Sequence, residues 1–389
     1  MNKYRSIVFC CLLLSIPTWG TSLQQPTAAN DTIAVQNKLE KISQQVKKSF
    51  HQLTKKAYIG YLGLRSADLL KNQQLLGNVD TMFDNLNHLL QNEIEPLIKQ
   101  GKKLSVLHFQ KTGERSYLDQ FEFYQYRIRG LILSNTEEFL EARKTLLKAS
   151  MHAEKLSNLI EKAYVLNNLS YCSFQVGKLE EATTELKEAV QIAEKTNSLS
   201  ALGLFLYNLG WVYLNTQQTE LAIPCFERSA EISQSLKLPI HELAALNNLG
   251  SIHLSRKEWK EAGTYFAKNL EIARELNSLR FRATSAFNFA VILAQKKQYQ
   301  KAASLLDEAL NIYESDGSAA FMNTEKRILK QKALLLLQFV NTQTRQQITS
   351  PYLESKIESQ ETILEGHIHS HFSHLLHAKN ESNSNQHKK

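Results

Sequence analysis

The residues best suited to chemistry in this sequence are histidines gathered near its C-terminal end. The segment "GHIHSHFSHLLH" at 366–377 places His367, His371 and His374 on one face of a helix, and such spacing can bind zinc or copper. No carboxylate or thiol joins this cluster, and an exposed polar helix would carry the same run of residues. A metal site at these three histidines is therefore a weak hypothesis, with a solvated helix as its alternative.

Other motifs that could carry catalysis are incomplete. "HELAA" at 241–245 begins like a zinc-protease helix but lacks the second histidine, and "GKLEEA" at 177–182 lacks the upstream glycine of a phosphate loop. Neither a nucleophile elbow nor a Cys-x-x-Cys pair is found. The sequence thus predicts no catalytic residue, no cofactor and no enzymatic activity. Nucleic acid is not an expected partner, because no basic stripe with interleaved aromatic residues occurs.

Asparagines in a repeating register form a more specific pattern. The segments "NNLS" at 167–170, "YNLG" at 207–210, "NNLG" at 247–250 and "FNFA" at 287–290 follow one another at a constant interval. In a helix interior, asparagine and glycine cost up to about 1 kcal/mol each relative to alanine. Their recurrence in one register indicates a use, which depends on the elements that carry them.

Composition predicts helices almost throughout. The 389 residues include only 14 glycines and 6 prolines, and no alternating segment rich in Val, Ile and Thr predicts a strand. The formal net charge of +8 is spread along the chain and is weak evidence for an acidic partner. Cys172 and Cys225 lie in different repeats, so we expect packed thiols and not a disulfide framework.

A secretory leader is expected at residues 1–20. Two basic residues precede an apolar run from 7 to 16, and a proline and small residues follow it, so cleavage is expected near Gly20. An uncleaved anchor, or lipidation at Cys10 or Cys11, are the alternatives. No later segment reaches the roughly 20 apolar residues that a membrane span needs. We therefore expect a periplasmic or secreted protein with no membrane span after removal of the leader.

Five consecutive units of equal length, each spanning the same interval as the asparagine segments, cover 123–317. Their twentieth positions are all alanine, namely Ala142, Ala182, Ala222, Ala262 and Ala302. Their eighth positions are small, namely Gly130, Ser170, Gly210, Gly250 and Ala290, and their twenty-fourth positions are Leu146, Leu186, Phe226, Phe266 and Leu306. Small residues let two helices approach closely, and the large apolar residue fills the space between them. Each unit is therefore predicted to be a helical hairpin.

This pattern resembles the tetratricopeptide repeat in its small-residue positions, in Tyr213 at position 11, and in Trp259 and Tyr299 at position 17. It departs from that repeat in its unit length, 40 instead of about 34 residues, and in lacking a proline near position 32. Longer units of this kind are similar to those of kinesin light chains, bacterial peptide-pheromone receptors and bacterial extracytoplasmic sensor regions. The resemblance implies an all-α, right-handed superhelical solenoid with the first helix of each hairpin on the concave side.

The flanking regions are expected to be mostly helical. Residues 31–122 should form a helical N-terminal cap, and residues 318–345 a capping helix. Residues 352–377 carry apolar residues in the pattern of an amphipathic helix, and residues 378–389 should form a disordered tail.

The first helix of each unit has two faces. Positions 4, 7, 8 and 11 cluster toward the second helix, whereas positions 2, 6, 9 and 13 cluster on the opposite, concave side. Amide side chains there can pair with peptide groups, and aromatic residues commonly anchor interfaces. We predict a peptide-binding groove formed by Asn168, Asn208, Asn248, Asn288, Gln175, Asn215, Gln295, Tyr164, Tyr171, Tyr207 and Trp211, with Ser255 also at position 13. The alternative is that these asparagines bond only to their neighbours or to water.

The preferred function is a non-enzymatic protein- or peptide-binding scaffold in a bacterial-type cell envelope. One alternative is a free-standing or truncated sensory module of a diguanylate cyclase or histidine kinase type of signalling system. Another is a cytoplasmic peptide-pheromone receptor, which requires that residues 1–20 are not a leader. The sequence specifies neither the identity of the protein or peptide partner nor the oligomeric state.

Overall fold

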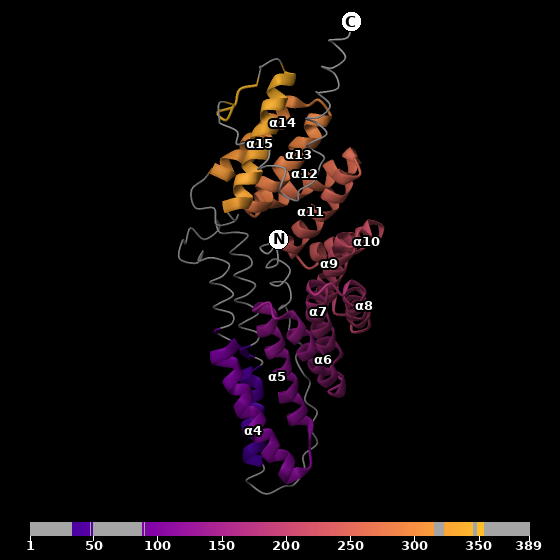
Figure 1. Ribbon diagram of the computed structural model, residues 1–389, viewed down its shortest axis with the longest axis vertical. Helices are drawn as coiled ribbons and strands as arrows, with labels where there is room; N and C mark the ends of the chain where they lie inside the picture. The colour runs from indigo at the N-terminus through magenta and orange to yellow at the C-terminus, as the bar shows by residue number, and fades with distance from the viewer. Residues whose placement is uncertain are drawn as a thin grey trace. The chain divides into compact units, whose positions relative to one another are not determined.

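The computed structural model describes residues 33–46, 48–49, 88, 90–314, 323–344 and 348–353. The described residues are helical apart from short turns, and no strand occurs among them. They form two compact units, with unit 1 ending at Lys237 and unit 2 beginning at Leu238 (Figure 1). The predicted leader, nearly all of the predicted helix at 352–377, the tail, and His367, His371 and His374 lie outside the described residues.

Unit 1 begins with helical segments that precede the repeats. A helix covers residues 33–46, and the π-helical turn η3 (Leu90–Ile94) leads into α4 (Glu95–Thr112), which packs against α5 (Ser116–Asn135). Gly113 ends α4 at φ 73°, and its N–H donates to the Phe109 carbonyl over 2.8 Å. Gly101 of α4 lies directly against the ring of Phe121, so the two helices approach closely there.

The repeats follow as pairs of helices of nearly constant length. In unit 1, α5 pairs with α6 (Phe139–Lys155), α7 (Leu159–Gln175) with α8 (Leu179–Lys195), and α9 (Leu199–Asn215) with α10 (Thr219–Ser235). In unit 2, α11 (Pro239–Ser255) pairs with α12 (Trp259–Glu275), α13 (Leu279–Gln295) pairs with α14 (Tyr299–Glu314), and α15 (Asn323–Gln343) packs on α14. The predicted fold class, an all-α array of helical hairpins, is confirmed.

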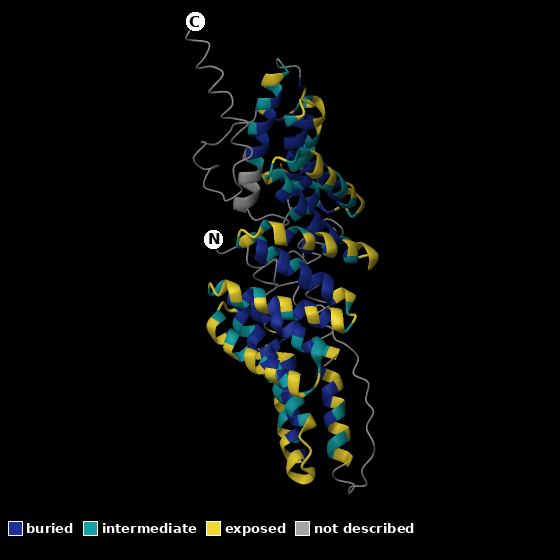
Figure 2. Ribbon diagram, turned by 90° about the vertical axis from the view of Figure 1, so that its right-hand side faces the viewer, coloured by how far each residue is buried: buried dark blue, intermediate teal, exposed yellow. Residues whose placement is uncertain are grey.

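Close packing within the pairs depends on the predicted small residues. The five alanines at position 20 are completely buried. A methyl group added to Gly250 would lie 2.8 Å from the Phe266 ring, and one added to Gly210 would lie 3.1 Å from the Phe226 ring. Both distances are shorter than the separation of about 3.5–4.0 Å that carbon atoms prefer. Figure 2 shows the result, with buried residues along the inner side of the helices and exposed residues along the outer side.

The turns recur at half the spacing of the sequence units, because each unit contains two of them. Positive φ angles occur at Glu137, Ser157, Gly177, Asn197, Gln217, Lys237, Lys257, Asn277 and Lys297. The next residue then donates its N–H to a carbonyl five residues earlier, as from Lys178 to Ser173 and from Gln298 to Leu293, each over 2.8 Å. Because the residue types at these positions differ, shared helix-end geometry and not shared side chains makes the turns alike.

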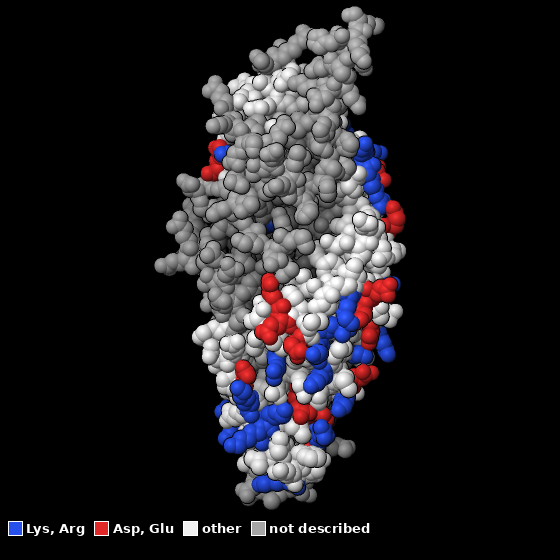
Figure 3. Space-filling model, viewed as in Figure 1, with Lys and Arg blue, Asp and Glu red and all other residues white. Residues whose placement is uncertain are grey.

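Charged residues of both signs intermingle on the described surface seen in Figure 3. In unit 1, ion pairs link neighbouring helices, for example Lys162 with Glu188 at 2.9 Å and Arg228 with Glu194 at 2.6 Å. Exposed pairs of this kind typically contribute less than about 1 kcal/mol each. Helix packing therefore dominates the stability of the array. None of the helices that the structure describes is long and apolar enough to cross a bilayer.

The two cysteines of the repeats are packed thiols, as the sequence predicted. Cys172 on α7 and Cys225 on α10 are buried and unpaired. Burial raises the pKa of each thiol to about 11. Both are therefore protonated at neutral pH and chemically inert.

Candidate peptide-binding surface

The predicted asparagine series lies in the middle of the first helices of four hairpins. Asn168 on α7 and Asn208 on α9 belong to unit 1, whereas Asn248 on α11 and Asn288 on α13 belong to unit 2. Each unit thus presents one pair. The two pairs have different surroundings.

In unit 1 the asparagines form a buried amide cluster, defined here as Asn167, Asn168 and Asn208. These side chains are 1%, 1% and 4% exposed. Nδ2 of Asn208 donates to Oδ1 of Asn167 over 2.7 Å. Nδ2 of Asn167, Oδ1 of Asn208 and both polar atoms of Asn168 have no hydrogen-bond partner. Leaving a buried polar group unpaired costs about 1–3 kcal/mol, so the cluster has unused hydrogen-bonding capacity in an unfavourable place.

A shallow, open hollow lies between the first helices α7 and α9, and Asn167 and Asn208 of this cluster line it. It is lined by Asn167, Ser170, Tyr171, Phe174, Leu186, Asn208, Trp211 and Val212. The rings of Phe174 and Trp211 are 4.7 Å apart, and Tyr171 contacts Phe139 edge-on at 5.8 Å. These contacts fix the aromatic walls, so the hollow is preformed.

Four predicted groove residues are more buried than their helical face suggested. An open concave side was expected for Tyr164, Tyr171, Asn168 and Asn208, yet all four are buried. The ring of Tyr164 packs edge-on against Phe205 of α9, with centroids 5.2 Å apart. The reason is that α7 contacts α5, α6 and α9 as well as α8, so little of its circumference is free. A helical wheel with only two faces misses these additional contacts.

The other predicted residues of unit 1 lie nearer the surface. Tyr207 is half-buried against Phe226, with ring centroids 5.7 Å apart, and Gln175 is also half-buried. Asn215 is exposed, and its Nδ2 donates to the carbonyl of Trp211 in its own helix over 2.7 Å. Asn215 therefore bonds to a close neighbour in its own helix, which is the alternative to peptide binding given in the sequence analysis.

In unit 2 the predicted residues Asn248, Asn288 and Gln295 are half-buried, and Ser255 donates to the Ile252 carbonyl. The fully buried asparagine there is Asn269 on α12, which the sequence analysis did not identify. Its Nδ2 donates to the Leu243 carbonyl over 2.6 Å, and its Oδ1 accepts from the Ser285 hydroxyl over 2.7 Å. Asn269 thereby ties together α11, α12 and α13.

Comparison with known families bears on the repeats themselves. Residues 161–235 and 241–315 match the family model described as tetratricopeptide repeat. The chain carries tetratricopeptide repeats. A search among curated proteins finds no significant match to the sequence.

Several solved structures are similar to this chain. The apo form of RapI has 17% identity and a TM-score of 0.54 over 80% of this chain and 86% of that one. A signal-transduction ATPase with a tetratricopeptide repeat sensor from Pyrococcus horikoshii has 13% identity and a TM-score of 0.51 over 88% and 60% of the respective chains. Kinesin light chain-like repeats from Podospora anserina have 18% identity and a TM-score of 0.43 over 51% and 96%.

A buried ion pair lies near α7 and α9, the helices that carry the amide cluster. Arg127 of α5 donates to Glu161 of α7 over 2.5 Å, and both side chains are 4% exposed. The positive charge of Arg127 is thus committed to an internal ion pair. On α8, burial raises the pKa of Glu185 to about 7, although a hydrogen bond from Ser173 and the charge of Arg143 oppose the shift.

Sequence reasoning assigned no role to three residues of the hollow, Asn167, Phe174 and Val212, and it placed Ser170 and Leu186 in the helix packing only. Asn167 is the first residue of the "NNLS" segment, and the same position in the next unit is occupied by Tyr207. A requirement for two polar residues in succession would have singled out Asn167. Phe174 lies at position 12, outside the face chosen for the groove, so only the neighbouring helix α9 reveals its role.

Proposed function

We propose that this protein is a non-enzymatic scaffold that binds an extended polypeptide segment along α7 and α9. The unpaired amide atoms Nδ2 of Asn167 and Oδ1 of Asn208, two residues that line the hollow, are the observation that carries the proposal. A peptide backbone offers N–H and C=O groups that complement such amides, and each bond formed contributes about 1 kcal/mol. Stacked repeats of this class generally present extended surfaces for binding.

The hollow beside the amide cluster supports the same proposal. Its walls include Tyr171, Phe174 and Trp211, and tyrosine and tryptophan are the residue types that most often dominate binding energy at interfaces. Burying one apolar side chain of the ligand between them would contribute about 1.5–3 kcal/mol. The ligand is therefore an extended segment with an apolar side chain next to the backbone groups that the asparagines bind.

We further propose that the protein acts in the cell envelope or outside the cell. The apolar run from 7 to 16 and the small residues near Gly20 support this location. Sequencing of the mature N-terminus from an envelope fraction should begin near Thr21. Recovery of the intact N-terminus from the cytoplasm would refute the location and leave the binding surface unaffected.

The binding surface can be tested with selected peptides. Random peptides displayed on phage are selected on the full chain, and the dissociation constants of the selected peptides are measured for Asn167→Ala, Asn208→Ala and the control Asn215→Ala. Each groove variant should weaken binding by about fivefold per lost hydrogen bond, whereas Asn215→Ala should bind normally because its amide is bonded to Trp211. N-methylation of the ligand backbone at one amide should mimic this loss.

The result against the proposal is equally defined. If peptides selected on the full chain bind Asn167→Ala and Asn208→Ala as tightly as the wild type, these amides do not hold the ligand. If thermal melting shows that a variant is unfolded, the N-methylated peptide gives the answer with the wild-type protein alone.

A further inference from the structure

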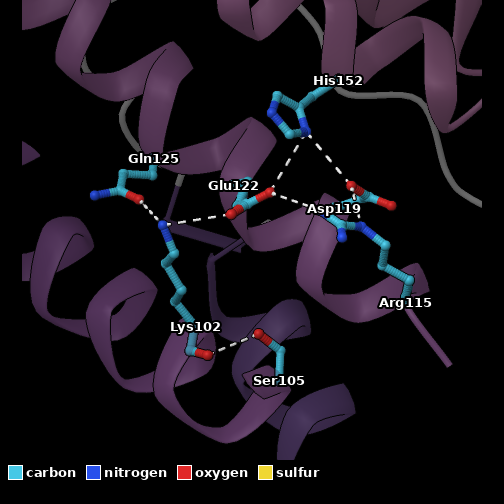
Figure 4. Close-up of polar contacts among 7 residues, drawn as sticks. All are labelled: Lys102, Ser105, Arg115, Asp119, Glu122, Gln125 and His152. Atoms are coloured by element: carbon cyan, nitrogen blue, oxygen red, sulfur yellow. Dashed lines mark hydrogen bonds and ion pairs between the residues drawn. The ribbon is translucent and has the colours of Figure 1, made fainter. Parts of the chain in front are cut away.

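A second cluster of polar side chains lies in the hairpin of α5 and α6, formed by Asp119, Glu122 and His152 (Figure 4). Asp119 and Glu122 are three residues apart on α5, so both side chains lie on one face of that helix. His152 comes from the last turns of α6. Each residue offers one donor atom, and the three atoms lie within 4.8 Å of one another.

The imidazole lies between the two carboxylates without a hydrogen bond to either. Nδ1 of His152 is 3.7 Å from Oδ1 of Asp119 and 3.9 Å from Oε2 of Glu122. These separations exceed the roughly 2.7–3.2 Å of an N–H···O hydrogen bond, and Nδ1 is buried with no hydrogen-bond partner. Two ligands held about 2.0–2.2 Å from a shared tetrahedral zinc ion lie a little more than 3 Å apart, so small side-chain shifts would complete a site.

Packing around the imidazole fixes its position. The ring of His152 stacks on Tyr126 with centroids 5.4 Å apart and an interplanar angle of 28°, and its side chain is 13% exposed. Both carboxylates are also largely shielded. The donor atoms are therefore held in a partly dry, preorganised place, as a metal site requires.

Two cations already face the carboxylates. Arg115 reaches Asp119 at 3.3 Å and Glu122 at 3.8 Å, and Nζ of Lys102 lies 3.7 Å from Glu122. The Arg115 side chain is 53% exposed, so it can turn into solvent when a divalent cation takes its place. Lys102 also donates to Gln125 over 2.7 Å, which keeps it to one side (Figure 4).

We propose that Asp119, Glu122 and His152 bind one divalent transition-metal ion that joins α5 to α6. One imidazole and two carboxylates suit zinc and its first-row neighbours, because calcium and magnesium prefer oxygen ligands alone. The ion would stabilise the first hairpin, since it binds the folded arrangement of the two helices and not the unfolded chain. Arg115 acts as a built-in competitor that holds the site in its metal-free state.

Calorimetric titration of the full chain with zinc chloride tests this site. A variant in which His367, His369, His371, His374, His377 and His387 are all changed to Gln serves as the background, so that the C-terminal histidines contribute nothing. In that background one equivalent of zinc should bind. His152→Gln and Asp119→Asn should each weaken it by about 10–100-fold or more, because even outer-shell changes have effects of that size.

Two further variants give the test its controls. His253→Gln should leave zinc binding unchanged, because His253 also stacks on a tyrosine but lies 2.5 Å from the single carboxylate of Glu258. Arg115→Gln should tighten binding several-fold, because it removes the competing positive charge from an exposed position. Absence of a zinc equivalent in the background variant, or its persistence after His152→Gln, would overturn the proposal.

Discussion

Buried asparagines have opposite surroundings in the two units. Asn168 on α7 and Asn269 on α12 are both almost completely shielded from solvent. Both polar atoms of Asn168 lack a partner, whereas those of Asn269 bind the Leu243 carbonyl and the Ser285 hydroxyl. A paired group contributes about 1 kcal/mol and an unpaired one costs about 1–3 kcal/mol, so one residue type weakens unit 1 and strengthens unit 2. Asn168 in unit 1 thus keeps unused hydrogen-bonding atoms, whereas Asn269 in unit 2 uses its atoms to link three helices.

Two largely shielded carboxylates, one in each unit, repeat the contrast. In unit 1, burial raises the pKa of Glu185 on α8 to about 7 despite Ser173 and Arg143. In unit 2, burial likewise acts on Glu308 of α14, but hydrogen bonds from Arg274 and Arg282 outweigh it and lower its pKa. Glu185 is thus poorly compensated for its burial, and Glu308 is held firmly in its charged form.

The largest expected effect is on the satisfied asparagine. Asn269→Leu keeps the side-chain volume but leaves the Leu243 carbonyl and the Ser285 hydroxyl without their partner. The free energy of unfolding should fall by about 3 kcal/mol, measured by urea denaturation of the full chain. In Asn269→Ser, which can keep one hydrogen bond, the free energy of unfolding should fall by less. An unchanged stability in Asn269→Leu would remove the contrast between the units.

The matching change in unit 1 should have the opposite sign. Asn168→Leu removes two unpaired buried polar atoms without removing a hydrogen bond, so the free energy of unfolding should rise by about 2 kcal/mol. Greater stability would confirm that both amide atoms of Asn168 lack a partner. Lower stability would show that the amide has a structural partner.

The carboxylates predict opposite responses to pH. Because the pKa of Glu185 is raised above its ordinary value of 4.5 to about 7, the folded state binds more protons between these values. The free energy of unfolding should therefore fall as pH rises through this window. The substitution Glu185→Gln should remove this pH dependence. At pH 8 the free energy of unfolding of the variant should exceed that of the wild type by on the order of 2 kcal/mol. Thermal melting from pH 5 to pH 8 measures the difference.

Glu308 supplies the control for this pH dependence. Its lowered pKa means that its stabilisation is present above the unfolded value of 4.5 and is lost as pH falls through the folded pKa. Glu308→Gln should therefore be destabilised throughout the range from pH 5 to pH 8. A Glu185→Gln variant that lost stability at pH 8 would show that Arg143 compensates the buried charge after all.

Repeating positions made the hairpins predictable. Alanine at position 20 and glycine opposite a large residue report directly on how closely two helices can approach, and Gly250 indeed lies against Phe266. The same regularity could not predict burial on the first helices, because it describes the contacts within one hairpin only. Tyr164 packs on Phe205 of the next hairpin, a contact that depends on how α7 and α9 stack.

Sites formed between helices were also beyond reach of the sequence patterns. Asp119 and Glu122 lie on a different helix from His152 and match no spacing motif, so only the packing of α5 on α6 brings them together. Asn269 occupies a position where three other units have alanine, namely Ala149, Ala189 and Ala309. The available signal was a polar residue at a position that is usually a buried alanine. The hydrogen-bond partners of Asn269, Leu243 and Ser285, lie on the adjoining helices, so the sequence pattern could not identify them.

The turns are the feature in which the two units agree, and they predict the smallest effect. Gly177 in unit 1 and Asn277 in unit 2 have the same role, with φ angles of 80° and 50°. A methyl group at Gly177 would contact nothing, so Gly177→Ala should lower the free energy of unfolding only through backbone strain, by about 1 kcal/mol. Asn277→Gly should raise it by a smaller amount, because asparagine already tolerates this conformation. If urea denaturation instead showed that both variants lose the same free energy of unfolding, the two turns would differ in more than their backbone conformation, and the units would not share this feature.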